Sequence, residues 1–288
     1  MRYNAAMIKP IKTYSLNNLK QLMKDLGQPS FRAKQLYEWL YLHHVGSYDE
    51  MTNLPQTLRV QLSADYPLFT PAVIDSQTSQ DGTAKYVISY HDRARVETVA
   101  IPSSDGRLTV CCSTQAGCAM GCTFCATGKE GFTRNLSAGE IVDQILIAQT
   151  RMGERVSNVV VMGQGEPFLN YEQTLNALHI LNDEKLLNIG ARHITLSTCG
   201  ILSGIDRLGT EPEQFTLAVS LHAAIQRTRD KIMPGVANYG LGKLKTVLLK
   251  YIERTNRRAT LEYAMMNRVN DNEEDLKALI EFCTGLLC

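Results

Sequence analysis

Strand-like and helix-like segments alternate from about residue 107 to the end of the chain, and this alternation limits the possible folds more than any other feature. Short runs rich in Val, Ile, Leu and Thr predict strands at residues 108–112, 158–162, 193–197, 216–221 and 260–265. Helical periodicity predicts helices near residues 138–151, 171–181, 241–254 and 273–282, the first beginning at a Ser137–Glu140 capping box. Repeated β-α units form a parallel sheet, open or closed into a barrel, and ligands bind beyond the carboxyl ends of its strands.

The first hundred residues follow a different pattern. Helices are predicted at 14–26 and 30–43, and strands at 72–76, 84–90 and 95–101 form an antiparallel meander. Ser30 is the predicted N-cap of the second helix, whose apolar side would contain Phe31, Leu36, Trp39 and Leu40. We therefore expect an α/β protein of three parts: a helical domain over residues 1–70, a β-meander or linker over 71–106, and a core over 107–288.

The eight cysteines indicate metal or redox chemistry rather than a disulfide framework. The N-terminus has no apolar leader and no apolar run is long enough to span a bilayer, which favours a cytoplasmic location with reduced thiols and no membrane contact. Five of the eight fall within one short stretch: Cys111, Cys112, Cys118, Cys122 and Cys125. The formal net charge of +1 neither favours nor excludes nucleic acid, because a binding face can be a local patch on a neutral protein.

Cys118, Cys122 and Cys125 have the spacing Cys-x3-Cys-x2-Cys on the loop after the first core strand. Three thiolates can bind three irons of a 4Fe–4S cluster and leave the fourth iron open. That iron can bind the amino and carboxyl groups of S-adenosylmethionine (SAM) and pass it an electron, which yields a 5′-deoxyadenosyl radical. The alternatives are a structural zinc site, which needs four ligands, and buried core cysteines. Cys199, outside the loop, is expected to be a packed hydrophobic residue.

Polar residues end three further predicted strands, where a cofactor would bind. Gly165 and Glu166 belong to a Gly-rich turn, in which glycine lets the backbone approach a ligand and the acid can accept hydrogen bonds from an ammonium group. The next two strands end in residues that can hold a ribose or a carboxylate: Ser197, and then Ser220, Leu221 and His222. Simpler interpretations remain open, namely turn chemistry for the glycines, a helix N-cap for Ser197 and a structural role for His222.

Together these segments resemble the dual-specificity RNA methyltransferases of the radical SAM superfamily, the RlmN/Cfr type, from about residue 15 to the end. The matching motifs are the three-cysteine loop and the segments 96–99, 131–136, 163–167, 197–200 and 220–223. Residues 31–39 resemble the helical RNA-binding region of the family. The resemblance implies a partial (β/α)6-type barrel with a 4Fe–4S cluster and SAM as cofactors.

The resemblance also implies methylation of carbon 2 of an adenosine in 23S rRNA, and in tRNA, with an external flavodoxin-like electron donor. In that mechanism one SAM methylates a carrier cysteine, a second SAM provides the radical, and another cysteine resolves the adduct as a disulfide. By motif, Cys111 matches the resolving cysteine and Glu97 the proton acceptor. A low-pKa thiolate would suit Cys111. The simpler interpretations are a core-facing cysteine and an exposed strand glutamate.

The chain departs from the family at its C-terminal end. The family's carrier cysteine lies in an Ala-Cys-Gly segment, and no such segment occurs here. Residues 281–288 resemble a helix end and the entry to a strand, so we expect the last barrel strand to be missing and methyl transfer to remain incomplete. Two alternatives stay open: the branch that methylates carbon 8 of adenosine, and a non-catalytic iron–sulfur RNA-binding fragment.

Overall fold

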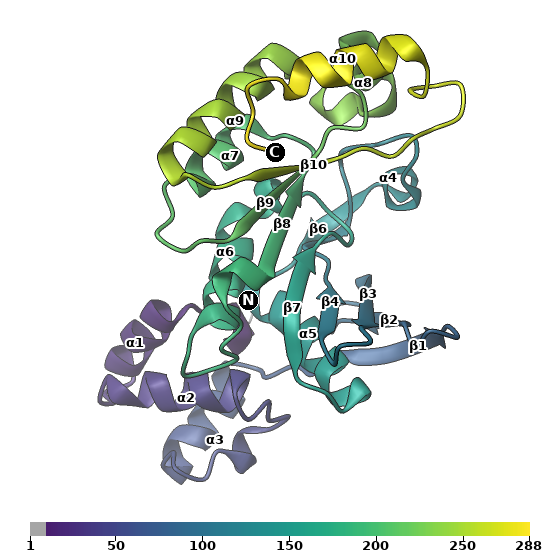
Figure 1. Cartoon of the computed structure of the whole chain (residues 1–288). Helices are drawn as coiled ribbons and strands as arrows, with labels where there is room; N and C mark the ends of the chain where they lie inside the picture. The colour runs from purple at the N-terminus through teal and green to yellow at the C-terminus, as the bar shows by residue number, and fades with distance from the viewer. Residues whose placement is uncertain (1–9) are drawn as a thin grey trace, which may run out of the picture.

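One mixed sheet of eight strands forms the centre of the structure, a computed structural model that describes residues 10–288 (Figure 1). In spatial order the strands are β1 (Ala72–Thr78), β2 (Ala84–Ser89), β3 (Arg95–Pro102), β4 (Leu108–Cys111), β7 (Val156–Val161), β8 (Ile194–Thr198), β9 (Thr216–Ser220) and β10 (Ala259–Glu262). Strands β1 to β4 pair antiparallel, and the strands from β4 onward pair parallel. The predicted parallel sheet is therefore confirmed, and the meander extends it because β3 pairs with β4.

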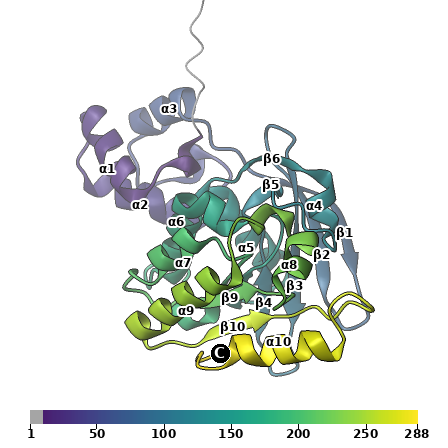
Figure 2. The ribbon, with the colours of Figure 1, turned by 90° about the horizontal axis from the view of Figure 1, so that it is seen from above.

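Helices α5 (Ala138–Met152), α6 (Tyr171–Asn182), α7 (Leu202–Leu208), α9 (Leu241–Thr255) and α10 (Glu273–Cys283) lie on one side of the parallel strands. The short helix α8 (Gln226–Ile232) lies at the carboxyl ends of β8 and β9, where its Arg229 contacts carbonyls at these ends. Figure 2 shows α6, α7 and α9 in a row along the outer side of the strands. The predicted capping box begins α5, because Ser137 Oγ accepts from the Glu140 amide and the Glu140 carboxylate accepts from the Ser137 amide. The short helices α7 and α8 were not predicted.

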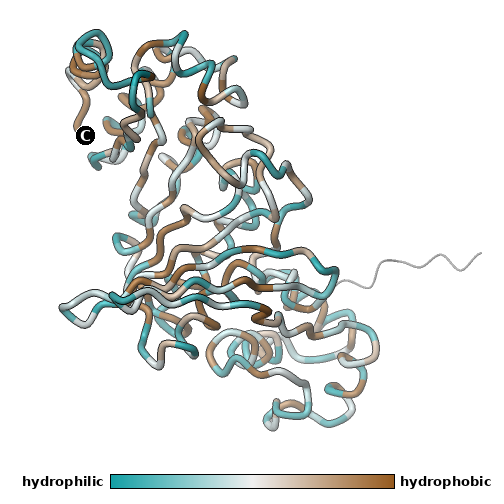
Figure 3. The backbone as a smooth tube through the Cα atoms, turned by 90° about the vertical axis from the view of Figure 1, so that its right-hand side faces the viewer, coloured by the Kyte–Doolittle hydropathy of each residue, from teal (hydrophilic) through white to brown (hydrophobic). Residues whose placement is uncertain are grey.

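The two faces of the sheet differ because alternate strand residues point to opposite sides. Val110, Val159, Leu196 and Leu217 point toward the helices, and each is at most 2% exposed. Figure 3 shows the corresponding concentration of hydrophobic residues along the strands. The opposite face, called the inner face below, carries partly exposed polar side chains. The hydrophobic core therefore lies on the helical side and leaves the inner face for a site.

A helical unit precedes the sheet and packs against α5 through the 3₁₀ turn η1 (Ile11–Thr13). Its other elements are α1 (Leu16–Asp25), α2 (Phe31–Tyr41), the 3₁₀ turn η2 (Tyr48–Glu50) and α3 (Gln56–Asp65), which was not predicted. Leu36 and Leu40 are fully buried, but Phe31 is 52% exposed and does not share their environment. Ser30 is the N-cap residue of α2, as predicted, but its side chain makes no capping hydrogen bond.

The long loop after β4 folds into small elements of its own. Strand β5 (Gln115–Gly117) pairs with β6 (Phe132–Asn135), and the short helix α4 (Ala126–Glu130) lies between them in the chain. Near the C-terminal end, the Ala259 amide of β10 donates to the carbonyl of Leu287 at 3.1 Å. No helix within residues 10–288 is long and apolar enough to cross a membrane.

Candidate active site

The inner face brings Glu97 and Cys111 together on neighbouring strands. Registered partners in adjacent strands point to the same face, and so do residues two apart in one strand. Cys111 is registered with Val99 of β3, two residues after Glu97, and with Val160 of β7. Glu97 and Cys111 therefore share one face, the one opposite the helices.

The same register places both serines on this face. Val160 is registered with Thr195, two residues before Ser197. Ser197 is registered with Ala218, two residues before Ser220, and Ser220 with Glu262 of β10. The inner face thus carries a row of candidate site residues on β3, β4, β8 and β9, with Val160 of β7 between Cys111 and the two serines.

The three cysteines of the predicted cluster lie on the loop between β5 and α4, above the strand ends. All eight cysteines of the chain are free thiols, and Cys122 is buried while Cys118 and Cys125 are partly exposed. The Cys118 amide donates to the Gly131 carbonyl at 2.8 Å, and the Thr123 amide to the Ile232 carbonyl at 2.9 Å, which fixes the loop at both ends. Three free thiols on one anchored loop, without a fourth cysteine on it, fit a cluster that keeps one iron open.

Cys199 connects this loop to the end of β8. Its thiol donates a hydrogen bond to Cys122, and this bond lowers the pKa of Cys122 while it raises that of Cys199. Burial, by contrast, raises the pKa of Cys118. Cys199 is partly buried and packs against the hydrophobic core, as the sequence suggested, and it also makes a specific contact with a proposed cluster ligand.

The Gly-rich turn after β7 packs against the start of the cysteine loop. A Cβ on Gly163 would lie 2.6 Å from Ser113 Oγ, and one on Gly165 would lie 2.6 Å from Gln115 Cβ. Gly165 also has a φ of +103°, a conformation that side chains rarely adopt. Both glycines therefore allow close approach of two backbone segments, here the turn and the cysteine loop.

Glu166 is 1% exposed and has protein partners for both carboxylate oxygens. Its Oε1 accepts from Thr198 Oγ1 at 2.8 Å and from the Phe168 amide, and its Oε2 accepts from the Cys199 amide at 2.7 Å. Burial raises the pKa of Glu166, and these hydrogen bonds oppose that shift. The side chain joins the turn after β7 to the end of β8.

Ser197 and Ser220 converge on a carboxylate that the sequence analysis missed. Glu262 Oε2 accepts from Ser197 Oγ at 2.9 Å and from Ser220 Oγ at 3.0 Å. Ser197 thus makes no helix N-cap, the simpler role considered for it. The predicted strand ran from residue 260 to 265, whereas β10 ends at Glu262, so the carboxylate lies at a strand end that the sequence placed three residues later.

His222 and Leu221 form the turn that follows β9. Both amides donate to the carbonyl of Glu262, and His222 has a φ of +54°. Its Nδ1 accepts from the Ala264 amide at 3.1 Å, so Nε2 carries the proton of the neutral ring. The ring also meets the Phe124 ring of the cysteine loop edge to face, with centroids 4.7 Å apart. Burial lowers the pKa of His222.

Arg229 is a second residue that sequence reasoning missed. It is 1% exposed and donates to three carbonyls at the ends of β8 and β9, those of Cys199, Ser220 and Leu221. A guanidinium has several donors in a fixed geometry, so one side chain can hold two strand ends. Arg229 reaches these carbonyls only through the tertiary fold, so its role could not be predicted from the sequence.

Cys111 and Glu97 differ from each other in burial. Burial raises the pKa of Cys111, so the expectation of a low-pKa thiolate is wrong for this state of the protein. Glu97 lies nearer the surface, where its Oε1 is 2.9 Å from Lys85 Nζ, and both side chains are partly exposed. The two residues share a face, with Glu97 on its open side.

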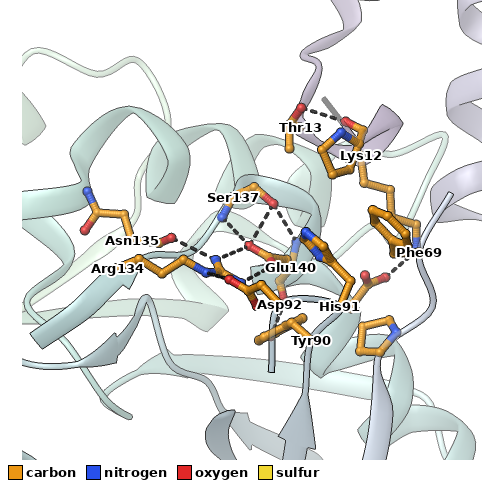
Figure 4. A pocket seen from close by; sticks show the side chains of 13 residues that line it. Lys12, Thr13, Phe69, Tyr90, His91, Asp92, Arg134, Asn135, Ser137 and Glu140 are labelled. Carbon is orange, nitrogen blue, oxygen red and sulfur yellow. Dashed lines mark hydrogen bonds and ion pairs between the residues drawn. The ribbon is translucent and has the colours of Figure 1, made fainter. Parts of the chain in front are cut away.

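A cavity of about 290 Å³ lies outside this row, between the helical unit and α5 (Figure 4). The rings of Phe69 and His91 stack in its wall with centroids 4.2 Å apart. Arg134 forms ion pairs with Asp92 and Glu140, and the other charged pair of the wall is Lys12–Asp143. The charged side chains of the wall are paired with one another, so among the described residues the cavity has no free cation to attract a phosphate. Its lining comes from both the helical unit and the core, and we interpret it as part of the contact between them.

Known proteins match both parts of this arrangement. The Radical SAM superfamily model matches residues 112–283, which contain the cysteine loop and the strand ends behind it. A crystal structure of a radical SAM methyltransferase from Sphaerobacter thermophilus is 41% identical, with a TM-score of 0.89 over 97% of this chain and 83% of that one. Fold and site therefore define a radical SAM methyltransferase, whose cofactors are a 4Fe–4S cluster and SAM.

The helical unit indicates which family of the radical SAM superfamily the chain belongs to. Residues 11–66 match the model described as Ribosomal RNA large subunit methyltransferase N-terminal domain. A probable dual-specificity RNA methyltransferase RlmN of Clostridium perfringens (strain SM101) is 43% identical over 98% of this chain and 81% of its own length. The protein of the same name from Geobacillus kaustophilus is 44% identical over 96% of this chain and 77% of its own length. The chain belongs to the RlmN family of radical SAM RNA methyltransferases.

Proposed function

We propose that the protein methylates carbon 2 of an adenosine in RNA, with 23S rRNA and tRNA as substrates. The main support is the inner face, where Glu97, Cys111, Ser197 and Ser220 form one row beside the cysteine loop. Bound cluster and SAM, reduced by a flavodoxin-like donor, supply the radical that activates a methyl group. A cytoplasmic location fits the eight free thiols.

In this proposal Cys111 and Glu97 act on the RNA adduct. The Cys111 thiol is the resolving group that forms a disulfide with a methyl-carrying cysteine and so releases the methylated base. Glu97, on the open side of the same face, accepts the proton that leaves the ring carbon. Its carboxylate is accessible to a base entering from the inner face. No cysteine of this sequence is assigned the carrier role.

The exposed side of α2 is the proposed RNA contact. Phe31 is 52% exposed, the guanidinium of Arg32 lies 4.9 Å from its ring centroid, and Lys34 is exposed on the same helix. Aromatic rings stack on unpaired bases, and cations bind phosphates. The target base must leave its stack to reach the inner face, so loosely structured RNA is the expected substrate.

The decisive experiment uses the chain purified without oxygen and reconstituted with iron and sulfide. After reduction it is incubated with SAM and with 23S rRNA or tRNA, and mass spectrometry quantifies 5′-deoxyadenosine and methylated adenosines. We expect 5′-deoxyadenosine from the native chain and from Cys111→Ala, and none from Cys122→Ala. Because no cysteine of this sequence is assigned the carrier role, the chain alone is not expected to complete methyl transfer. A methylated adenosine that does form should be 2-methyladenosine and should be absent with Cys111→Ala.

Two other results would replace the proposal. Formation of 8-methyladenosine would assign the chain to the carbon-8 branch. Intact SAM in the presence of a full iron complement would indicate a non-catalytic iron–sulfur protein that binds RNA.

A further inference from the structure

Three neighbouring strands each contribute one side chain to a hydroxyl–carboxylate cluster, made of Ser197 (β8), Ser220 (β9) and Glu262 (β10). Both serine hydroxyls donate to the same atom, Glu262 Oε2, and the two serine oxygens are 3.4 Å apart. The Glu262 backbone is fixed as well, because its carbonyl accepts from the amides of Leu221 and His222. The carboxylate is therefore held in place by β8, β9 and its own strand.

Glu262 differs from Glu166, the acid chosen from the sequence, in what its oxygens can still bind. Both oxygens of Glu166 are occupied by protein donors in a fully buried position. Glu262 is only partly buried, and its hydrogen-bonded partners among residues 10–288 are the two neutral hydroxyls on Oε2. Its Oε1 thus has capacity for further donors on the inner face.

The hydroxyl–carboxylate cluster lies next to the residues of β8 and β9 that contact the cysteine loop. Cys199, two residues after Ser197, hydrogen-bonds Cys122. His222, two residues after Ser220, packs against Phe124. A ligand bound at the open iron can therefore reach the hydroxyls and the carboxylate without leaving the inner face.

We propose that Glu262 binds the ribose hydroxyls of SAM, and this assignment rests on the radical SAM function proposed above. A carboxylate with two oxygens suits the two adjacent O–H donors of a ribose, as acids at the strand ends of nucleotide-binding folds do. Ser197 and Ser220 already demonstrate that neutral hydroxyls are accepted at this position. The negative charge also attracts the positively charged sulfonium of the same cofactor.

The experiment measures SAM binding rather than turnover. The cluster-loaded chain, kept oxidised and free of oxygen, is titrated with SAM in a calorimeter. Glu262→Ala is expected to weaken binding by about 10- to 100-fold, the usual effect of losing hydrogen bonds to a charged group, and Glu262→Gln by less. Glu253→Gln makes the same chemical change on the exposed side of α9 and should leave binding unchanged.

A second probe isolates the hydroxyl. S-(2′-deoxyadenosyl)methionine should bind the native chain about 10-fold more weakly than SAM does, and Glu262→Ala should bind the two ligands alike. Iron content and the urea midpoint of each variant verify that it folds and holds its cluster, and Glu262→Gln replaces Glu262→Ala if the latter does not fold.

The outcomes separate this inference from the proposed function. If the native chain binds and cleaves SAM but Glu262→Ala and Glu262→Gln bind both ligands as the native chain does, the ribose assignment is wrong and the proposed function stands. If the native chain binds no SAM with its cluster in place, both are wrong.

Discussion

Arg229 illustrates at the residue scale how one buried cation can hold two strand ends. Its guanidinium donates to the carbonyls of Cys199, Ser220 and Leu221. We expect Arg229→Met to lower the free energy of unfolding by about 2–4 kcal/mol, because buried carbonyls that lose a charged donor are left unsatisfied. Urea denaturation of the cluster-free chain under anaerobic conditions measures the loss.

Arg227, on the same helix α8, provides the matched control. It pairs with Glu274 at 3.2 Å, and the two side chains are 72% and 67% exposed. An exposed pair contributes little to stability, so Arg227→Met should change the free energy of unfolding by no more than about 0.5 kcal/mol. Equal losses in the two variants would contradict the role given to Arg229.

His222 predicts a pH dependence of stability. Burial lowers its pKa below the ordinary value of 6.5, so in acid the unfolded chain takes up a proton that the folded chain resists. Stability contributed by the neutral ring is complete above pH 6.5 and falls as the pH drops toward the folded pKa, by at most about 1.4 kcal/mol per pH unit.

The test compares urea midpoints of the native chain and His222→Asn between about pH 7.5 and about pH 5.5. Asparagine keeps an acceptor near the Ala264 amide and tolerates the positive φ of this residue. The native chain should lose more stability in acid than the variant. Parallel profiles would mean that another group controls the acid response.

At the scale of elements, the contact between the turn after β7 and the cysteine loop depends on Gly163. A Cβ there would lie 2.6 Å from Ser113 Oγ and 2.8 Å from the Cys112 carbonyl, so Gly163→Ala should cost about 1–3 kcal/mol and reduce iron incorporation. Gly242 has open space around it, and Gly242→Ala is the control expected to preserve both. Urea midpoints and iron content after reconstitution measure the two effects, and normal values for Gly163→Ala would refute the argument.

Elements with strong periodicity could be predicted, and those fixed by tertiary contacts could not. Strands β4 and β7 to β10 are apolar on the helical face, and α5 carries its own capping box, so local sequence is sufficient. Helices α7 and α8 are seven residues each, too short for a clear period. The β5–β6 pairing joins segments on either side of the cysteines, which no local pattern reports.

The same distinction applies to the site. Cys118, Cys122 and Cys125 are recognisable because their spacing is local. Glu262 and Arg229 act through partners on other strands, and an isolated Glu or Arg in a sequence is most often a surface residue. The row on the inner face becomes visible only when strand order and register are known.

At the scale of the whole molecule, one buried ion pair joins the helical unit to the core. Lys12 Nζ lies 2.5 Å from Asp143 Oδ1, and the two side chains are 7% and 2% exposed. The partners are 131 positions apart in the chain, so the sequence offered no sign of the pair. Removing Lys12 leaves the buried Asp143 carboxylate with the more distant His44 ring, whose Nε2 lies 3.6 Å from Oδ1, and breaking a buried pair destabilises proteins by about 3–5 kcal/mol.

We therefore expect Lys12→Met to uncouple the two parts of the protein. Trp39 is the only tryptophan and lies on α2, so its fluorescence reports the helical unit, whereas circular dichroism reports the whole chain. In urea the two signals should change together for the native chain, and the fluorescence should change first in Lys12→Met. Lys277→Met, which removes a pair with side chains 80% and 93% exposed, should leave the transitions coincident. Coincident transitions in Lys12→Met would show that the apolar contacts of η1 with α5, rather than the ion pair, make the two parts unfold as one.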